Sequence, residues 1–273
     1  MLEGIVTRSI AELLPDKVTE VRIRRGRPLV YLSALSRKET SHVVSDREFD
    51  EVLALITDRS LYAITEKLVN GYLPLKGGLR VGIAGEGVMD GINVKTVKHI
   101  TSLVLRIPHQ IFGIASFLRI DGNFEKNILI ISPPAAGKTT LLREIARTLS
   151  EGGKNVVILD ERGEIGGVCG TRFALDVGKN SDVLFGFPKR IAYENALRAM
   201  NPDYLVADEL SGESDVEGVL RAHYGGVKVV ATLHGDSEEA FFGIFAPLKK
   251  VFDLIVLLSK TPSVGSVRKV VTR

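Results

Sequence analysis

One stretch of the chain has the residue types and the spacing of a phosphate-binding loop. It consists of Ser132, Pro133, Pro134, Ala135, Ala136, Gly137, Lys138, Thr139 and Thr140. In such a loop, backbone N–H groups and the start of a helix face the phosphate oxygens. A lysine reaches the β- and γ-phosphates, and a threonine hydroxyl coordinates Mg²⁺. We therefore predict that this stretch binds ATP, with Lys138 at the phosphates and Thr139 as a ligand of Mg²⁺.

Two positions depart from the usual pattern Gly-x-x-x-x-Gly-Lys-[Ser/Thr]. Ser132 stands at the first glycine, where a small side chain fits at the end of a strand. Ala135 lies in the middle of the loop. Where a loop position needs a positive φ, a Cβ costs roughly 1 kcal/mol or more, so Ala135 is the more serious departure.

A pair of acids follows an apolar run later in the chain. In the stretch NPDYLVADEL, Asp208 and Glu209 stand where a predicted strand ends. This is the Walker B pattern, in which the first acid holds Mg²⁺ and the second orients or deprotonates the attacking water. By itself, the pair is more simply explained as two acids at the end of a strand. Because this pair follows a phosphate loop in the correct order, we predict Asp208 as a metal ligand and Glu209 as a catalytic residue.

Two further strand ends carry polar side chains. Asp160 and Glu161 follow the run VVIL, and His234 follows KVVATL. Because the carboxyl ends of neighbouring parallel strands face one crevice, these side chains are expected near the phosphate site. From position alone, the acids fit a loop cap equally well, and a lone histidine at a strand end favours a structural role.

The second half of the chain alternates short β-branched or leucine-rich runs with longer amphipathic runs. This alternation is typical of a mainly parallel sheet flanked by helices, and it predicts an α/β fold. The predicted strands are residues 127–131, 155–159, 204–207, 227–233 and 254–258, and the predicted helices are residues 138–150, 190–200, 215–224 and 237–251.

The first part of the chain has the pattern of a smaller α+β domain. Its predicted strands are residues 18–23, 28–31, 94–98 and 103–107, its predicted helices are residues 46–57 and 61–70, and a hairpin turn is predicted at residues 76–78. Proline, glycine and aspartate interrupt the chain between Pro108 and Gly122. We therefore predict an N-terminal α+β domain at 1–110, a linker at 111–122 and the α/β domain at 123–273.

The composition is that of a globular protein of the cell interior. The chain has 273 residues, 45% of them hydrophobic, and a net charge of +3, which gives little reason to expect nucleic acid as the main partner. Its single cysteine, Cys169, excludes an internal disulfide and fits a reducing compartment. We find no signal-peptide pattern and no apolar run long enough to span a bilayer. A cytoplasmic protein is expected, with membrane contact only through partners.

Over nearly its whole length, the chain resembles the stage III sporulation protein AA family, relatives of the type II and type IV secretion ATPases. The matching segments are VRIRRGRPL, SLYAITEKLVNGYLPLKGGLRVGIAGE, VKHITSLVLRI, ISPPAAGKTTLLRE, LDERGEI, DVGKNSDVLFGFPK, LRAMNPDYLVADE and ATLHGD. The resemblance implies a RecA-like P-loop ATPase core after the N-terminal domain and a hexameric ring with ATP between the domains. The implied function is that of the ATP-hydrolysing motor of a secretion-like channel from mother cell to forespore, with membrane proteins of that channel as partners.

The resemblance also assigns roles to single residues. Asp160 and Glu161 match the acidic box of the family, and His234 matches its histidine box. Arg80 and Arg106 stand where the N-terminal domains of secretion ATPases carry arginines that reach the phosphates. A guanidinium there would neutralise charge that develops in the transition state. The simpler alternative for each arginine is a solvated side chain on a strand.

The chain departs from the family pattern at three places. Ala135 replaces a glycine of the loop, Ser211-Gly212 replace Gly-Arg after the acids, and Asn180-Ser181 replace Arg-Thr. These departures favour an alternative function, an ATP-gated oligomeric scaffold with weak or no hydrolysis. A nucleic-acid-dependent ATPase is a second alternative. Its only support is the basic stretch RIRRGRP, which lacks interleaved aromatic residues for base stacking.

Overall fold

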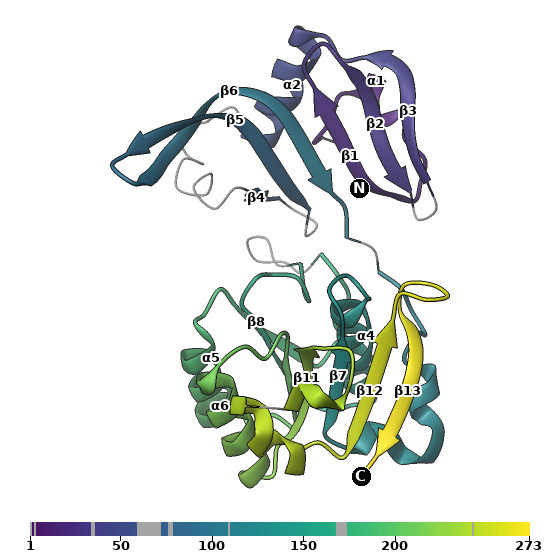
Figure 1. Ribbon diagram of the computed structural model, residues 1–273, viewed down its shortest axis with the longest axis vertical. Coiled ribbons are helices and arrows are strands. Elements are labelled where there is room, and N and C mark those ends of the chain that lie inside the picture. The colour runs from purple at the N-terminus through teal and green to yellow at the C-terminus, as the bar shows by residue number, and fades with distance from the viewer. Residues whose placement is uncertain are drawn as a thin grey trace. The chain divides into compact units, whose positions relative to one another are not determined.

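The structure is a computed structural model that describes residues 2, 4–33, 36–58, 72–75, 79–108, 110–167, 174–241 and 243–273. The chain forms two compact units, and the second begins at Gln110 (Figure 1). The predicted helix at 61–70, the predicted turn at 76–78 and Cys169 lie outside the described residues. We describe each unit by itself.

Unit 1 is built on a six-stranded antiparallel sheet with the strand order β3-β2-β1-β6-β5-β4. Its elements are α1 (Arg8–Ala11), β1 (Val18–Arg24), β2 (Pro28–Ser33), β3 (Ser36–Val43), α2 (Asp46–Ile56), β4 (Tyr72–Pro74), β5 (Arg80–Asp90) and β6 (Asn93–Arg106). The predicted hairpin of residues 18–23 and 28–31 is present as β1 and β2. The prediction of separate strands at 94–98 and 103–107 was wrong, because β6 runs through both and pairs with β5 along its length.

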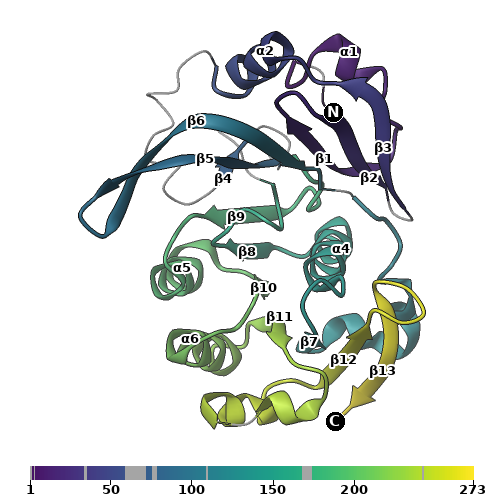
Figure 2. The same cartoon turned by 45° about the horizontal axis from the view of Figure 1, so that its top comes forward.

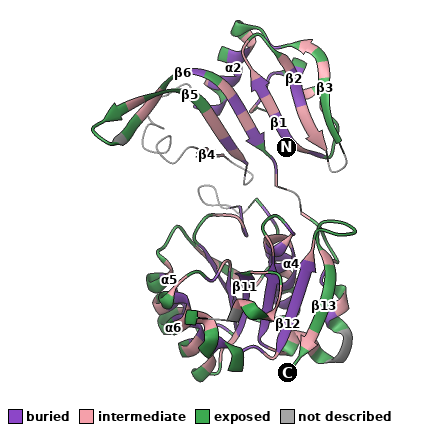
Figure 3. Ribbon diagram, viewed as in Figure 1, coloured by how far each residue is buried: buried purple, intermediate pink, exposed green. Residues whose placement is uncertain are grey.

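Helix α2 covers one face of this sheet. Its start is fixed by Ser45, whose hydroxyl accepts a hydrogen bond from the backbone N–H of Glu48 at 3.2 Å. Apolar residues recur at helical spacing, and Phe49, Val52 and Ile56 are buried against the sheet (Figure 3). Unit 1 therefore has its own hydrophobic core.

Unit 2 is built on a seven-stranded sheet with the strand order β13-β12-β7-β11-β10-β8-β9, in which only the β12–β13 pair is antiparallel. Its strands are β7 (Ile128–Ser132), β8 (Val156–Asp160), β9 (Ser181–Phe185), β10 (Tyr204–Ala207), β11 (Lys228–His234), β12 (Leu254–Ser259) and β13 (Ser266–Thr272). Its helical segments are η3 (Ser116–Glu125), α4 (Lys138–Glu151), α5 (Lys189–Asn195), η4 (Ala196–Met200), α6 (Glu213–Tyr224), η5 (Glu238–Phe241) and η6 (Gly243–Lys250). The predicted α/β fold with a mainly parallel sheet is confirmed.

Helices cover both faces of this sheet, because successive side chains of each buried strand point to opposite faces. Ile128 and Ile130 of β7 belong to the cluster that contains α4, whereas Leu129 and Ile131 belong to the cluster that contains α5 and α6. Figure 2 shows α4 on one side of the strands and α5 and α6 on the other. This layered arrangement leaves the carboxyl ends of the parallel strands free to carry side chains with chemical functions.

Two predictions for unit 2 need correction, and one strand was missed. Residues 237–251 form the 3₁₀ segments η5 and η6 rather than one α-helix, and Pro247 lies inside η6. The predicted helix at 190–200 changes at Ala196 from α-helix to a π-helical turn. Strand β9 was not predicted. Its exposed and half-buried residues lack the apolar run that marks the central strands, because it lies at the edge of the sheet.

Helices α5 and α6 approach each other closely at Gly218. A Cβ at this position would lie 2.3 Å from the ring of Tyr193, so only glycine fits there. The close approach lets the hydroxyl of Tyr193 reach the buried carboxylate of Asp215 at 3.4 Å. The packing of these helices is therefore linked to the polar groups beside the predicted Walker B strand.

We expect Gly218→Ala to destabilise unit 2 by about 1–3 kcal/mol, because the added methyl group must displace a fully packed ring. The measurement is urea unfolding followed by circular dichroism. Gly212→Ala is the matched control, because no atom lies within 4 Å of a Cβ at that position and its backbone is extended. Equal stability of the two variants would contradict the packing argument.

Candidate nucleotide-binding site

The polar ends of three adjacent strands meet at one edge of the parallel sheet. Strand β11 lies between β7 and β10, and its register places His234 opposite Ser132. A cavity of about 440 Å³ opens at this edge. It is lined by Pro134, Ala135, Gly137, Lys138, Thr139, Thr140, Glu164, Asp208, Glu209, His234 and Val264. Parallel pairing thus brings the predicted phosphate loop and the predicted Walker B acids into one cavity.

The loop turns sharply between β7 and α4. Ala135 has a φ of 56° and Gly137 a φ of 90°, both in the left-handed region. No side chain caps the N-terminus of α4, and its first turn contains no acid. The backbone N–H groups at this end therefore have no capping acceptor from a side chain of the described residues, and the helix dipole favours an anion there.

Asp208 connects the loop to the neighbouring strand. One oxygen of its carboxylate accepts a hydrogen bond from the hydroxyl of Thr139 at 2.8 Å, and the other accepts one from Thr232 at 2.7 Å. The oxygen of Thr232 in turn accepts the backbone N–H of Glu209 at 2.7 Å. The predicted metal ligands Thr139 and Asp208 are thus in direct contact. Thr232, which sequence reasoning missed, fixes their position.

Glu209 has an unusual backbone conformation, and each oxygen of its carboxylate contacts a nitrogen of another side chain. Its φ is 49°, which is uncommon for a residue with a side chain. Nε2 of His234 lies 3.2 Å from Oε1, and the guanidinium of Arg162 lies 3.0 Å from Oε2. Strained backbone of this kind clusters at functional sites. The geometry therefore places Glu209 where its carboxylate faces the cavity with a fixed orientation.

Lys138 is largely buried and faces the same groups. Its ammonium lies 3.2 Å from Nδ1 of His234. Burial lowers the pKa of Lys138, and the negative charges of Asp208, Glu209 and Glu164 partly oppose this shift. A phosphate group in the cavity would favour the charged form of this lysine in the same way as these acids.

Asp160 has a structural role at the end of β8. It is almost fully buried, and its carboxylate accepts hydrogen bonds from the backbone N–H groups of Glu164, Ile165 and Gly166. Burial raises the pKa of Asp160, and these three N–H groups oppose the shift. The sequence left two alternatives for this acid, a place near the phosphates or a loop cap. These hydrogen bonds are those of a loop cap. The capped loop delivers Glu164 to the cavity.

Glu161 is exposed and lies outside the large cavity. It lines a smaller neighbouring pocket of about 40 Å³, together with Arg162, Lys189 and Glu209. Its catalytic role remains a prediction.

A second polar network holds the backbone of Glu209. The ammonium of Lys189 donates to the backbone carbonyl of Glu209 and lies 3.2 Å from the buried carboxylate of Asp215. The same carboxylate accepts the N–H groups of Ser211 and Gly212. These two residues, which stand where the family usually has Gly-Arg, therefore bind Asp215 through their backbones. No sequence pattern pointed to Lys189, because it lies on another element.

Some predicted site residues lie elsewhere. Ser132 and Ala136 are buried and do not line the cavity, and the hydroxyl of Ser132 donates to the carbonyl of Pro133. Arg80 and Arg106 are cross-strand partners in unit 1.

Each of these two arginines contacts a side chain of a strand in unit 1. Arg80 packs over the ring of Tyr72 at 5.1 Å, and Arg106 lies 3.7 Å from Glu20. Their role at the phosphates stays a prediction.

Val264 is a further residue that the sequence did not indicate. It lies in the connection between β12 and β13 and lines the cavity. The connection approaches the phosphate loop so closely that a Cβ on Gly137 would lie 3.3 Å from the Cα of Gly265. Gly137 is therefore required both for its positive φ and for this contact.

Comparison with known proteins identifies related sequences. The family described as "Sporulation stage III, protein AA" matches residues 4–273. The stage III sporulation protein AA of Bacillus subtilis (strain 168) is 35% identical, over 83% of this chain and 81% of its own length.

Comparison with solved structures identifies the fold. The Yersinia pseudotuberculosis ATPase DotB has a TM-score of 0.62 at 16% identity, over 91% of this chain and 72% of DotB. The pilus retraction motor PilT, solved with bound ADP, has a TM-score of 0.67 at 14% identity, over 96% of this chain and 80% of PilT. The chain therefore shares its fold with the ATPase DotB and the motor PilT.

The positive φ of Ala135 yields a test of strain in the loop. We expect Ala135→Gly to raise the free energy of unfolding by about 0.5–1 kcal/mol, because glycine removes the steric cost of the left-handed region. Chemical denaturation measures the change. The neighbouring Ala136→Gly serves as the control and is expected to lower stability, since Ala136 is buried and has a negative φ. A loss of stability in Ala135→Gly would contradict this view of the loop.

Proposed function

The chain belongs to the sporulation stage III protein AA family, and we propose that it binds ATP with Mg²⁺ in the cavity at residues 134–140 and hydrolyses it. The observation that carries the proposal is the carboxylate of Asp208, which joins the hydroxyl of Thr139 in the loop to that of Thr232 on the next strand. This constellation supports nucleotide chemistry because it stands beside a helix N-terminus that has no side-chain cap.

The cavity fits a triphosphate. Ala135 and Gly137, both with a positive φ, line the cavity together with Lys138. We propose that backbone N–H groups of this turn and the ammonium of Lys138 bind the phosphates. Glu164, Asp208 and Glu209 also line the cavity and would repel a bare anion. A site of this composition therefore requires a cation to accompany the phosphates.

Mg²⁺ fits the donor set. It prefers oxygen ligands and is usually held by one or two carboxylates together with substrate phosphates. Asp208 and Thr139 supply such oxygens, and among the described residues no group of three or more His, Cys, Asp or Glu side chains is arranged to hold a metal by itself. When bound, Mg²⁺ supplies charge neutralisation at the phosphates. Thr232 keeps Asp208 oriented for this role.

Hydrolysis would rest on Glu209, with His234 and Lys138 as its neighbours. We propose that Glu209 accepts a proton from the attacking water, while Lys138 stabilises charge on the phosphates. His234 lies between these two residues, within 3.2 Å of each, and positions both. Lys189 holds the backbone of Glu209, so the carboxylate is directed by contacts on two sides.

The relatives support a proposal for the biological setting. Because a relative is a stage III sporulation protein and the fold is that of the ATPase DotB and the motor PilT, we propose that the chain is the motor of a secretion-like channel assembled during sporulation. The described residues contain no helix long and apolar enough to cross a membrane. We therefore propose that membrane proteins of the channel recruit the ATPase, which acts as a ring of identical chains.

One observation favours a second candidate function, an ATP-gated scaffold. Both carboxylate oxygens of Glu209 are engaged, one by Arg162 and one by His234, and a general base must be released from such contacts before it can accept a proton. The positive φ of Ala135 adds strain to the loop. A protein with these features would bind ATP and turn it over slowly.

Glu209→Gln separates the two functions. For a motor, we expect ATP turnover to fall by about 10²- to 10⁴-fold, because the general base is lost, while the affinity for ATP changes little. Phosphate release measures turnover, and calorimetry measures binding. Glu213→Gln, an exposed acid at the start of α6, is the matched control. If the parent turns over no faster than Glu209→Gln, the motor function is wrong and the scaffold remains.

Removal of a metal ligand tests the Mg²⁺ site. We expect Thr139→Ala to weaken ATP binding by about tenfold or more with Mg²⁺ present, because a direct oxygen ligand and its contact to Asp208 are lost. Calorimetry with Mg²⁺ and with EDTA provides the measurement. Thr148→Ala lies on the same helix and serves as the control, since its hydroxyl donates to the carbonyl of Glu144. An equal loss in EDTA would show that Thr139 does not act through the metal.

A further inference from the structure

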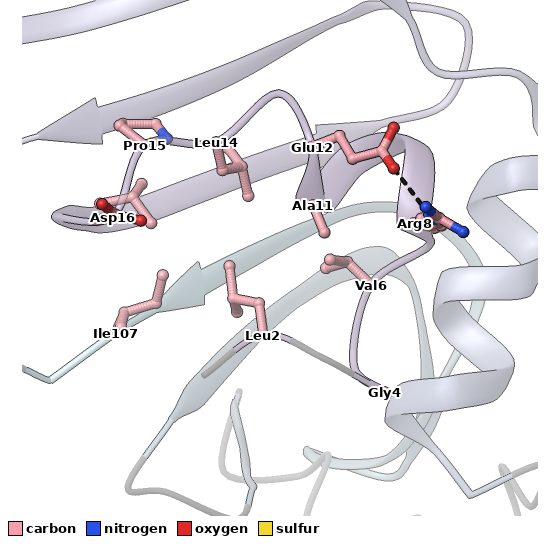
Figure 4. Close-up of a pocket in the computed structure, with 11 residues that line it drawn as sticks. Leu2, Gly4, Val6, Arg8, Ala11, Glu12, Leu14, Pro15, Asp16 and Ile107 are labelled. Carbon is pink, nitrogen blue, oxygen red and sulfur yellow. Dashed lines mark hydrogen bonds and ion pairs between the residues drawn. The ribbon is translucent and has the colours of Figure 1, made fainter.

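A large cavity lies in unit 1, and none of the residues proposed to bind ATP lines it. Its volume is about 710 Å³, and the side chains of Leu2, Val6, Ala11, Leu14 and Ile107 converge on it (Figure 4). The cavity adjoins the hydrophobic core of the unit, because Leu2, Val6 and Ile107 belong to that core. An open apolar cavity of this kind is suited to receive apolar side chains from outside.

Charged side chains mark the rim of this cavity. Arg8 and Glu12 are paired at 2.7 Å, so their charges offset each other. Asp16 also lines the cavity and has no ion-pair partner among the described residues. The next residue, Lys17, is also exposed and carries a positive charge.

The hairpin of β5 and β6 ends in an exposed apolar tip, which we define as Met89, Ile92 and Val94. Ile92 is 94% exposed, Met89 55% and Val94 36%. Met89 and Val94 are cross-strand partners, so they lie on the same face, and Ile92 stands in the turn between the strands. A cluster of exposed apolar side chains at the end of a projecting hairpin indicates an interaction surface.

The tip and the cavity are positioned for contact between molecules rather than within one. In Figures 1 and 2, the end of the β5–β6 hairpin and helix α1, which borders the cavity, lie at opposite ends of unit 1. The tip of a chain therefore does not reach the cavity of its own unit. In a pair of chains, the tip of one chain can meet the cavity of the other.

The charges next to the two surfaces match. Lys95 directly follows Val94 on β6, is exposed and has no ion-pair partner within the described part of the chain. Asp16 is its counterpart at the cavity. Attraction between Lys95 and Asp16 favours contact between the tip and the cavity. The exposed Asp90 beside the tip likewise has the charge opposite to that of Lys17 beside Asp16.

We propose that the apolar tip of one chain inserts into the unit 1 cavity of a second copy, with Lys95 of one chain beside Asp16 of the other. The contact is head to tail, since each chain offers a tip at one end and a cavity at the other. Such a contact closes into a ring or extends into a filament. It involves neither nucleotide nor the parallel sheet, so it stands or falls independently of the ATPase function.

Two variants that each block one half of the contact provide the test. Ile92→Glu places a charge on the tip, and Ala11→Trp fills the cavity. We expect each variant alone to associate about tenfold more weakly or worse than the parent, measured by sedimentation equilibrium without nucleotide. Leu14→Lys is a second cavity variant in case Ala11→Trp does not fold. Val43→Glu, an exposed valine on β3 with 54% exposure, is the matched control and should associate as the parent does.

Mixing the variants tests the head-to-tail arrangement. An equal mixture of Ile92→Glu and Ala11→Trp retains one intact tip and one intact cavity, so it should form dimers that cannot grow further. A mixture that remains monomeric would overturn the proposal, as would a parent that stays monomeric throughout its soluble range. Lys95→Asp should also weaken association, and Asp16→Lys in the same chain should restore it. Failure of this restoration would overturn the pairing of Lys95 with Asp16.

Discussion

The candidate site depends on the parallel pairing of β7, β11 and β10. Parallel strands in adjacent positions end at the same edge of the sheet, so residues that are far apart in sequence meet there. Thr139 follows β7, Thr232 lies on β11, and Asp208 follows β10. Their two hydrogen bonds, at 2.8 and 2.7 Å, are possible only while the three strands keep this order. The order, in turn, is maintained by two apolar layers, one on each face of the sheet.

The same edge concentrates backbone strain. Ala135 and Glu209 both have a positive φ and both line the cavity, although neither is glycine. Such conformations persist only where the surrounding contacts determine them. For Glu209, the contacts are the hydroxyl of Thr232 on its N–H group and the ammonium of Lys189 on its carbonyl. These contacts hold the backbone of Glu209 in its strained conformation and so fix the position of its carboxylate. Because Lys189 lies on α5 and also contacts Asp215 of α6, the position of Glu209 depends on the packing of these two helices.

Unit 1 presents a different physical situation. Its sheet is antiparallel, so strand ends alternate in direction and do not form one shared polar edge. Exposed apolar residues gather instead at the tip of its long hairpin. The cavity bordered by α1 is the complementary feature. We propose association for the tip and cavity of unit 1, and nucleotide binding for the polar edge of unit 2.

The sequence by itself determined the α/β class and the central strands, and it singled out the loop at residues 132–140 and the acids Asp208 and Glu209 as a candidate site. These features are local, because an apolar run, a helix start and an acid at a strand end are visible in a few consecutive residues. Only the tertiary structure decided that Asp160 caps a loop, that β6 is one strand, and that Thr232, Lys189 and Val264 belong to the site. Each of these depends on contacts between elements distant in sequence, which sheet order and helix packing create and local residue patterns do not encode.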